Sequence, residues 1–328
     1  MTIRIGLLGA SRIAPPAVIA PAKAHDGFEV IAVAARDPER AKAYAAEHGI
    51  PNISPDYASL VTRDDVDVVY NALPPAGHAK WTIAALEAGK AVLCEKPFAR
   101  NEADAEAMVA TARRVGRPLL EAAHYRFHTV VLQARKLVEA GTFGRLTRAE
   151  ATFNVNIPKS PDELRWRADQ GGGAQMDLGF YPLHALRTIL GGEPRVLSAE
   201  ADFVDGVDAT MSAELDFSGV PAHIECSMVA ERFQANLALE GENGRLDIAN
   251  FIAPQLGCRF TSTIGEETTT HATDGPTTYA AQLQHLFEVM DGAPALVGGD
   301  DALAHMKAMA DIYRAAGGPL EARPDARS

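Results

Sequence analysis

The sequence contains few cysteines and no long apolar run. Its three cysteines, Cys94, Cys226 and Cys258, are an odd number without the spacing of a metal site. We therefore expect reduced thiols in a cytoplasmic protein, and no bound metal. No apolar stretch is long enough to span a bilayer, and no signal peptide precedes the strand-like segment that begins at Ile3. We expect no membrane partner.

The chain also lacks an excess of positive charge, internal repeats and low-complexity linkers. Its net charge is −12, which argues against nucleic acid as a partner but not against a local basic pocket for a phosphate. The composition, 47% hydrophobic and 23% charged, is that of an ordinary globular enzyme. Because the 328 residues exceed the size at which one core usually suffices, about 250–300 residues, we expect two domains.

The first 121 residues alternate between apolar strands and helix-like segments. Strands are predicted at residues 3–9, 28–34, 66–71, 92–94 and 118–121. Apolar residues on both sides of the pleat indicate strands that are buried on both faces, as in a parallel sheet. The rhythm predicts an α/β, doubly wound parallel sheet, the Rossmann fold of dinucleotide-binding domains, over residues 1–121.

A degenerate dinucleotide fingerprint follows the first predicted strand. Gly9 is the tight-turn glycine, Ser11 replaces the second glycine and Ala14 the third. The pattern alone is common in loops, but the strand before it and the helix-like sequence after it strengthen it. We expect this loop, including Arg12 and Ile13, to bind the cofactor.

Two arginines follow the second predicted strand, where such domains read the ribose. Arg36 and Arg40 are one helical turn apart, and two guanidinium groups suit the 2′-phosphate of NADP. We expect Asp37 to turn toward the start of the next helix. The alternatives are that the arginines are merely solvated, or that Asp37 reads the ribose of NAD.

A carboxylate, an ammonium group and a proline end the strand 92–94. Lys96, between Glu95 and Pro97, lies at the carboxyl edge of the sheet, where ligands bind in such folds. It is a candidate proton donor or acceptor. The alternative is a surface ion pair. Three further cofactor-binding candidates are expected at the same edge: Leu73, Pro74 and His78. For His78 the alternative is an exposed helix residue.

After residue 121 the rhythm changes to strands in which apolar and polar residues alternate. Residues 211–217 and 222–228 show this period of two, which predicts a largely antiparallel sheet with one covered face. Helices are predicted at 128–139, 279–290 and 301–315. We assign residues 122–328 to a second, α+β domain that binds substrate.

Three glycines at 171–173 precede a further helix. Glycines permit the close approach of a ligand to the backbone. If the helix starts just after them, Asp177, Tyr181 and His184 share one stripe. An acid, a phenol and an imidazole on one face indicate a binding site. The alternative is a cap at Asp177 and a buried, hydrogen-bonded Tyr181, and His184 by itself favours a structural role.

These motifs, in this order and spacing, resemble those of the Gfo/Idh/MocA oxidoreductases. The resemblance is to the branch with dimeric dihydrodiol dehydrogenase, NADP-dependent xylose dehydrogenase and glucose–fructose oxidoreductase. It rests on residues 9–14, on Glu95-Lys96-Pro97, and on the run from Gly171 to Tyr181. Residues 121–128 and 311–313 resemble that branch too, so nearly the whole chain is covered.

The resemblance implies a Rossmann domain and a second domain whose large open-faced sheet commonly makes the oligomer interface, so we expect a homodimer or homotetramer. It implies a cis bond before Pro97 and a catalytic set of Lys96, Tyr181 and Asp177. Further expected cofactor contacts are Glu95, Lys96, Arg126, Trp166 and Arg167. The expected substrate contacts are His124, Asp177, Tyr181 and His184. Two departures are Ser11 in the fingerprint and His124, where an apolar or aromatic residue is more usual.

The expected function is reversible hydride transfer between NADP and a hydroxyl-bearing carbon of a sugar, a cyclic polyol or a dihydrodiol. One alternative is an aldose–aldose oxidoreductase that keeps its NADP bound. Another is a non-catalytic NADP-binding sensor. The presence of Lys96, Asp177 and Tyr181 argues against the sensor, which has no need of them.

Overall fold

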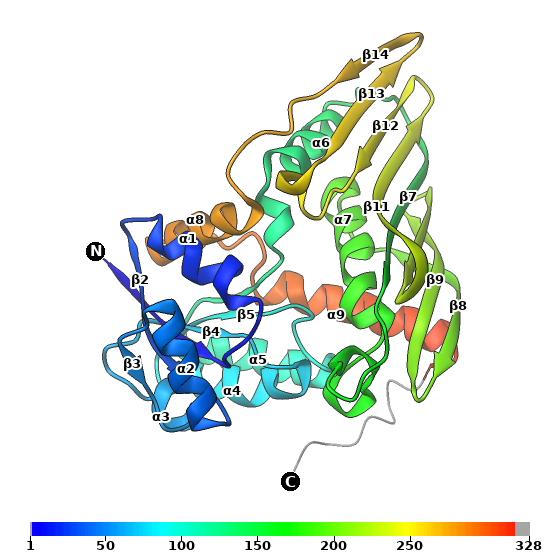
Figure 1. Ribbon diagram of the computed structural model, residues 1–328. Coiled ribbons are helices and arrows are strands. Elements are labelled where there is room, and N and C mark those ends of the chain that lie inside the picture. The colour runs from blue at the N-terminus through cyan, green and yellow to red at the C-terminus, as the bar shows by residue number, and fades with distance from the viewer. Residues whose placement is uncertain (1, 319–328) are drawn as a thin grey trace. The chain divides into compact units, whose positions relative to one another are not determined.

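The computed structural model describes residues 2–318, which divide into two compact units (Figure 1). Unit 1 comprises the residues up to Ala123 together with Tyr279–Met306. Unit 2 comprises His124–Thr278 together with the residues from Lys307 onward. None of the helices among residues 2–318 is long and apolar enough to cross a bilayer.

Unit 1 is built on a sheet of six parallel strands in the order β3-β2-β1-β4-β5-β6. This is the doubly wound order of dinucleotide-binding folds, and it confirms the predicted α/β class. The strands are β1 (Ile3–Leu8), β2 (Phe28–Ala34), β3 (Asn52–Ile53), β4 (Val68–Asn71), β5 (Ala91–Cys94) and β6 (Leu119–Glu121). The helices are α1 (Ala20–Lys23), α2 (Pro38–His48), α3 (Tyr57–Val61), α4 (Pro75–Glu87), α5 (Glu102–Val115), α8 (Thr278–Met290) and α9 (Gly299–Ala315), the last of which continues into unit 2.

The helix that follows the fingerprint is wound in two ways. Residues Pro15–Ile19 form a π-helix and α1 continues from it, so that Pro21 lies just after the winding changes. This helix packs on one face of the sheet. Apolar side chains of β1, β4 and β5 share a buried core with it.

Residues 279–306 belong to unit 1, whereas the sequence had assigned them to the second domain. The reason is packing: Leu283, Leu286 and Val289 of α8 are buried in the core that contains β1. Phe287 also meets Phe28 at the start of β2, with ring centroids 5.8 Å apart. Figure 1 shows α8 beside α1, although the two are far apart in the sequence. The hydrophobic pattern of a helix does not say which core it joins.

Unit 2 is built on a sheet of eight strands in the order β14-β13-β12-β11-β7-β10-β9-β8. All neighbours are antiparallel except β7 and β10, which are parallel. The strands are β7 (Leu146–Asn156), β8 (Arg195–Val204), β9 (Val207–Phe217), β10 (Val220–Ser227), β11 (Val229–Gly241), β12 (Gly244–Ala249), β13 (Arg259–Ile264) and β14 (Glu267–Thr270). The predicted, mostly antiparallel second sheet is confirmed.

One face of this sheet is covered by helices of the same unit. α6 (Thr129–Glu139) and α7 (Phe180–Leu190) lie along it in Figure 1, and α7 packs on β7 and β10. Apolar side chains such as Leu215, Ile224 and Leu237 are buried on that face. On β9 and β10 most of the alternate residues, which lie on the other face, are polar, as the period of two predicted. Among them, His223 Nδ1 lies 2.8 Å from Glu214 Oε1.

Candidate active site

The fingerprint loop turns sharply at Gly9, immediately after β1. Gly9 has a φ of +97°, and a Cβ there would lie 3.2 Å from Leu73 Cδ2, so only glycine fits without strain. Ser11 Oγ accepts a hydrogen bond of 3.2 Å from the backbone N–H of Ala14. Ser11, which stands in place of the second fingerprint glycine, therefore stabilises the start of the helix. Arg12 is exposed and Ile13 packs against the core.

Helix α2 holds the fingerprint loop from the side. Arg40 Nη2 donates to the carbonyl of Ala10 across 2.7 Å, and Tyr44 Oη donates to the carbonyl of Ser11 across 2.9 Å. The two side chains are one helical turn apart and so lie on the same face of α2. Tyr44 belongs to no motif of the sequence, and its spacing of one helical turn from Arg40 is the only sequence feature that points to it.

The end of β2 carries the positive charge that was expected to select the cofactor. Asp37 Oδ1 accepts from the backbone N–H groups of Glu39, at 3.0 Å, and Arg40, at 3.4 Å. The carboxylate thus faces the start of α2, as predicted, and Arg36 and Arg40 are exposed. Both arginines lie close to Tyr57: burial raises the pKa of this phenol, and the charges of Arg36 and Arg40 oppose the rise.

The loop after β5 holds Lys96 between two fixed neighbours. The peptide bond between Lys96 and Pro97 is cis, as the resemblance implied. Tyr70 Oη donates to Glu95 Oε1 across 2.5 Å, and the backbone N–H of Glu95 donates to the carbonyl of Asn71 across 3.0 Å. The lysine backbone is therefore placed by hydrogen bonds on either side of it, which is how a reactive group is preorganised.

The ring of His78 lies against backbone carbonyls with both of its nitrogens. The ring is fully buried, with Nδ1 3.0 Å from the carbonyl oxygen of Pro97 and Nε2 2.7 Å from that of Leu73. Burial lowers the pKa of His78, and the hydrogen bonds to these carbonyls oppose the change. The alternative of an exposed helix residue is therefore wrong, and contact with the cofactor stays a prediction. It ties the Lys96 loop to the segment at Leu73.

Tyr181 lies in a buried aromatic cluster of unit 2. It is 6% exposed, and its Oη lies 3.3 Å from Nε2 of His124, in the 3₁₀-helix His124–Phe127. One turn further along α7, His184 Nδ1 is 2.6 Å from the hydroxyl of Tyr125. The His184 ring also stacks on Phe180, with centroids 5.2 Å apart. Tyr181 and His184 therefore meet the same ring, because Tyr125 also packs 5.6 Å from Tyr181.

Asp177 lies in a π-helix, Gln175–Gly179, that precedes α7 and that the sequence did not predict. Its Oδ2 accepts from Arg165 Nε across 2.5 Å, and Arg165 Nη1 also donates to Glu163 Oε1 across 3.0 Å. The Asp177 charge is the main cause that raises the pKa of Arg165. The predicted single stripe is thus modified: Asp177 pairs with Arg165, and only Tyr181 and His184 share the aromatic cluster. π-turns of this kind are frequent at functional sites.

Two of the three glycines, which were expected to permit the close approach of a ligand, lie tightly against the protein itself. A Cβ on Gly172 would lie 2.4 Å from the carbonyl oxygen of Arg165, and one on Gly173 would lie 2.1 Å from Asp208 Oδ1. Asp208 is fully buried and accepts from the backbone N–H of Gln175, at 2.6 Å, and from Tyr313 Oη, at 2.7 Å. It fixes the start of the helix that carries Asp177.

The remaining cofactor-binding candidates of unit 2 make hydrogen bonds within the protein. Trp166 Nε1 donates to the carbonyl of Ile157 across 2.8 Å, and the ring is 9% exposed. Arg126 Nη1 donates to the Thr188 hydroxyl, and the exposed Arg167 pairs with Asp169 at 2.8 Å. Unit 1 thus brings together the fingerprint loop, the Leu73 segment and the Lys96 loop, and unit 2 brings together His124, Tyr181 and His184.

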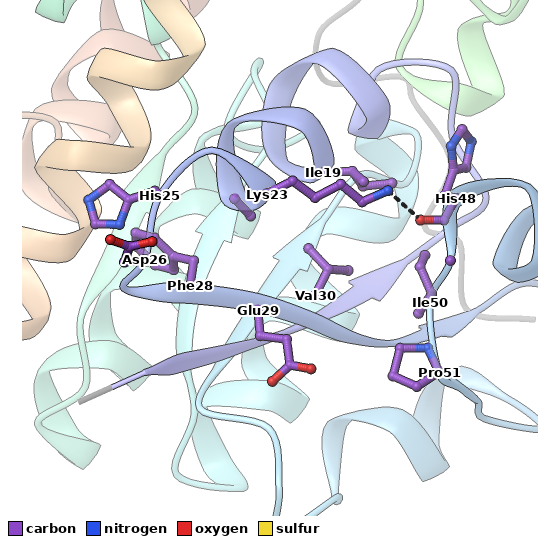
Figure 2. A pocket seen from close by; sticks show the side chains of 12 residues that line it. Ile19, Lys23, His25, Asp26, Phe28, Glu29, Val30, His48, Ile50 and Pro51 are labelled. Atoms are coloured by element: carbon purple, nitrogen blue, oxygen red, sulfur yellow. Dashed lines mark hydrogen bonds between the residues drawn. The ribbon is translucent and has the colours of Figure 1, made fainter.

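A cavity of about 340 Å³ in unit 1 is separate from these residues. Figure 2 shows it beneath Lys23, whose Nζ donates to the carbonyl of His48 across 2.8 Å. Its lining includes Phe28 and Val30 at the start of β2, whereas Gly9 hydrogen-bonds to Ala34 at the end of that strand. The cavity is therefore at the opposite edge of the sheet from the fingerprint loop.

Comparisons with known proteins agree with this geometry. Residues 3–123 match the model of an oxidoreductase family with an NAD-binding Rossmann fold, GFO_IDH_MocA, and residues 131–247 match its C-terminal domain. The chain is 32% identical to D-xylose 1-dehydrogenase (NADP(+)) 2 of Haloferax volcanii, over 95% of this chain and 96% of that one. It is 38% identical to dTDP-3,4-didehydro-2,6-dideoxy-alpha-D-glucose 3-reductase of Streptomyces violaceoruber, over 78% and 75%.

Solved structures are similar over almost the full length. An aldose–aldose oxidoreductase from Caulobacter crescentus, complexed with glycerol, superposes with a TM-score of 0.89 at 28% identity, over 97% of this chain and 98% of that one. A 3-ketoreductase from Actinomadura kijaniata, in complex with NADP and TDP-benzene, superposes with a TM-score of 0.86 at 27% identity, over 96% and 98%.

Proposed function

The chain belongs to the Gfo/Idh/MocA family of oxidoreductases, and from that premise we propose that it transfers a hydride between NADP and a hydroxyl-bearing carbon of a sugar, a cyclic polyol or a dihydrodiol. The observation that carries the proposal is the loop around Lys96, at the carboxyl edge of the parallel sheet. Both neighbours of Lys96 are held by hydrogen bonds, Glu95 by Tyr70 and Pro97 by His78. A lysine whose backbone is fixed in this way favours a catalytic role over a solvated surface ion pair.

The residues of unit 1 fit NADP. Gly9 leaves the turn after β1 without a side chain, and the loop leads to a helix that begins at Pro15, which is the arrangement that binds a pyrophosphate in such domains. Arg36 and Arg40 supply positive charge for a 2′-phosphate, because Asp37 turns its carboxylate to α2. Arg40 uses one N–H on Ala10, and a guanidinium has five. When bound, the nicotinamide supplies the hydride acceptor or donor.

In this proposal Tyr181 and Lys96 handle the proton. In oxidation the substrate hydroxyl loses its proton to the Tyr181 oxygen, and in reduction Tyr181 returns it. The Lys96 ammonium stabilises the negative charge that develops on the substrate oxygen. Asp177 accepts a hydrogen bond from a substrate hydroxyl while Arg165 holds its Oδ2 in place.

The test is turnover of the purified protein with NADP on aldoses, inositols and trans-dihydrodiols, and with NADPH on dTDP-linked keto sugars. We expect reduced nicotinamide to form or disappear with at least one substrate, and Lys96→Met to serve as the inactive control that still binds NADPH. Cofactor binding without turnover on the whole panel would favour a sensor instead.

A second candidate is an aldose–aldose oxidoreductase, which the similarity to the Caulobacter crescentus structure favours. Such an enzyme keeps its nucleotide bound and passes the hydride between two sugars. The purified protein would then show nicotinamide absorbance before any cofactor is added. Release of the nucleotide on dilution, with turnover that depends on added NADP, supports the dehydrogenase.

We also propose a cytoplasmic homodimer or homotetramer that associates through the polar face of the second sheet. The free thiols, two of them fully buried, support a reducing compartment. Thr152 lies on the central strand β7 of that face, so Thr152→Arg should weaken the association. Light scattering tests this: a monomeric parent protein would contradict the proposed assembly.

A further inference from the structure

Four side chains from distant parts of unit 2 form a chain of hydrogen bonds that ends on Tyr181. His124 Nε2 lies 3.3 Å from Tyr181 Oη, and His124 Nδ1 lies 2.9 Å from Thr278 Oγ1. Gln255 Nε2 in turn lies 3.3 Å from Thr278 Oγ1. The side chains of Tyr181, His124 and Thr278 are buried, with exposures of 6%, 5% and 0%. Water therefore competes little for these hydrogen bonds.

The need of a buried hydroxyl proton for an acceptor gives this chain of hydrogen bonds a direction. An amide nitrogen only donates, so the Thr278 hydroxyl accepts from Gln255. Thr278 is fully buried, and of its two hydrogen-bond partners only His124 Nδ1 can accept, so the hydroxyl proton points to His124 Nδ1. A neutral imidazole whose Nδ1 accepts carries its proton on Nε2. His124 then donates from Nε2 to the Tyr181 oxygen, and the phenol proton is directed to another acceptor.

We propose that His124 is a positioning residue for proton transfer at Tyr181, and that Thr278 and Gln255 fix the tautomer in which it acts. The inference rests on the proposed function, in which the Tyr181 proton moves to the substrate oxygen and leaves a phenolate. The N–H of His124 stabilises that phenolate by a hydrogen bond to its oxygen. In the reverse direction the phenolate takes the substrate's hydroxyl proton, and His124 keeps its own proton throughout.

The tautomer can be measured without any turnover. In the full chain labelled with ¹⁵N-histidine, NMR correlations between ring nitrogens and carbon-bound ring protons distinguish protonated from bare nitrogens. The His124 signals are identified by their loss in His124→Met. We expect the proton on Nε2. A proton on Nδ1 would overturn the proposal whether or not the protein acts on any sugar, so this result is independent of the proposed function.

A double-mutant cycle tests the catalytic part of the proposal. His124→Met should lower kcat by about 10- to 100-fold, the value of one hydrogen bond to a charged group, and change KM little. The same substitution should have no further effect on Tyr181→Phe, because His124 acts through the phenol oxygen. Losses that multiply in the double variant would show that His124 acts independently, and would overturn the proposal.

Conservative variants separate positioning from packing. His124→Gln places an amide nitrogen near the position of Nε2 and should recover most of kcat. Thr278→Ser should keep the rate, whereas Thr278→Val should lose it as His124→Met does. The matched control is Tyr125→Phe, which removes a buried hydroxyl of the same cluster that bonds His184. It should leave the proton of His124 on Nε2, whereas Thr278→Val should release it from that position. Failure of His124→Gln and Thr278→Ser to keep the rate would contradict the positioning role.

Discussion

Arg36 offers the sharpest separation between the two cofactors. A charge-assisted hydrogen bond to a 2′-phosphate contributes about 1.5–3 kcal/mol, and roughly 1.4 kcal/mol is tenfold in affinity. Because Arg36 is exposed and therefore screened by solvent and salt, we take the low end of this range. Arg36→Ala should raise KM for NADP by about tenfold and leave KM for NAD nearly unchanged. Arg40→Ala should weaken both cofactors, because its guanidinium also holds the carbonyl of Ala10.

The assay is steady-state kinetics with each cofactor at two salt concentrations. The matched control is Lys42→Ala, which removes a positive charge from α2 two residues beyond Arg40 and hence from a different side of the helix. Its effect on the KM for NADP and for NAD should be no larger than the loss of one distant positive charge produces. A parent enzyme that prefers NAD, or an Arg36→Ala variant that loses both cofactors equally, would refute this reasoning and make Asp37 the ribose reader.

Three further predictions concern Lys96, the neighbours Tyr181 and His184, and the ion pair of Arg4 with Asp67. Lys96→Met should lower kcat by about 10²–10⁴-fold with NADPH binding retained in a fluorescence titration; a near-normal kcat would remove Lys96 from the mechanism. Tyr181→Phe should lower kcat strongly and Tm little. His184→Ala should lower Tm and leave the rate of the folded fraction unchanged. If Tyr181→Phe instead lowers Tm and its folded fraction keeps its rate, Tyr181 is structural. Hydrogen bonds from Arg4 lower the pKa of Asp67, so this pair stabilises the fold fully above the ordinary carboxyl pKa of about 3.9, and the effect is lost as pH falls through the lowered pKa of the folded state. Asp67→Asn should thus lower the free energy of unfolding by about 1–2 kcal/mol at pH 7 and by progressively less as pH falls below about 3.9; a loss that does not change with pH would contradict the assignment.

Much of the fold follows from patterns that are local in the sequence. Buried strands with turn residues between them predict the parallel sheet, and the period of two predicts the second sheet with one covered face. The position of α8 does not follow, since the pattern of an amphipathic helix does not specify which core it packs against. The same holds for the π-helices before α1 and α7, which no local pattern in the sequence predicts. In the second of them, a Cβ on Gly179 would lie 2.1 Å from Gln175 Oε1, a contact that also cannot be read from the sequence.

The candidate site is predicted to the extent that its residues follow strand ends and helix starts. Gly9, Asp37 and Lys96 are found in this way, because each is placed by the element beside it. Contacts between residues far apart in the chain are not. Asp208, 33 positions from Gln175, and the His124 partner Thr278, 154 positions away, have no local signal. For that reason the sequence does not predict the close protein contacts of Gly172 and Gly173.

The central claim is hydride transfer from a hydroxyl-bearing carbon. Its most direct test uses a sugar on which the parent protein turns over, or each sugar of the panel in turn, with deuterium on the carbon that bears the hydroxyl group. After incubation with NADP, mass spectrometry of the nicotinamide nucleotide locates the label. The account predicts one deuterium in the reduced nicotinamide, formed far more slowly with Lys96→Met. Reduced nicotinamide without deuterium, with the label in water instead, would contradict it, as would the absence of any labelled nucleotide across the panel.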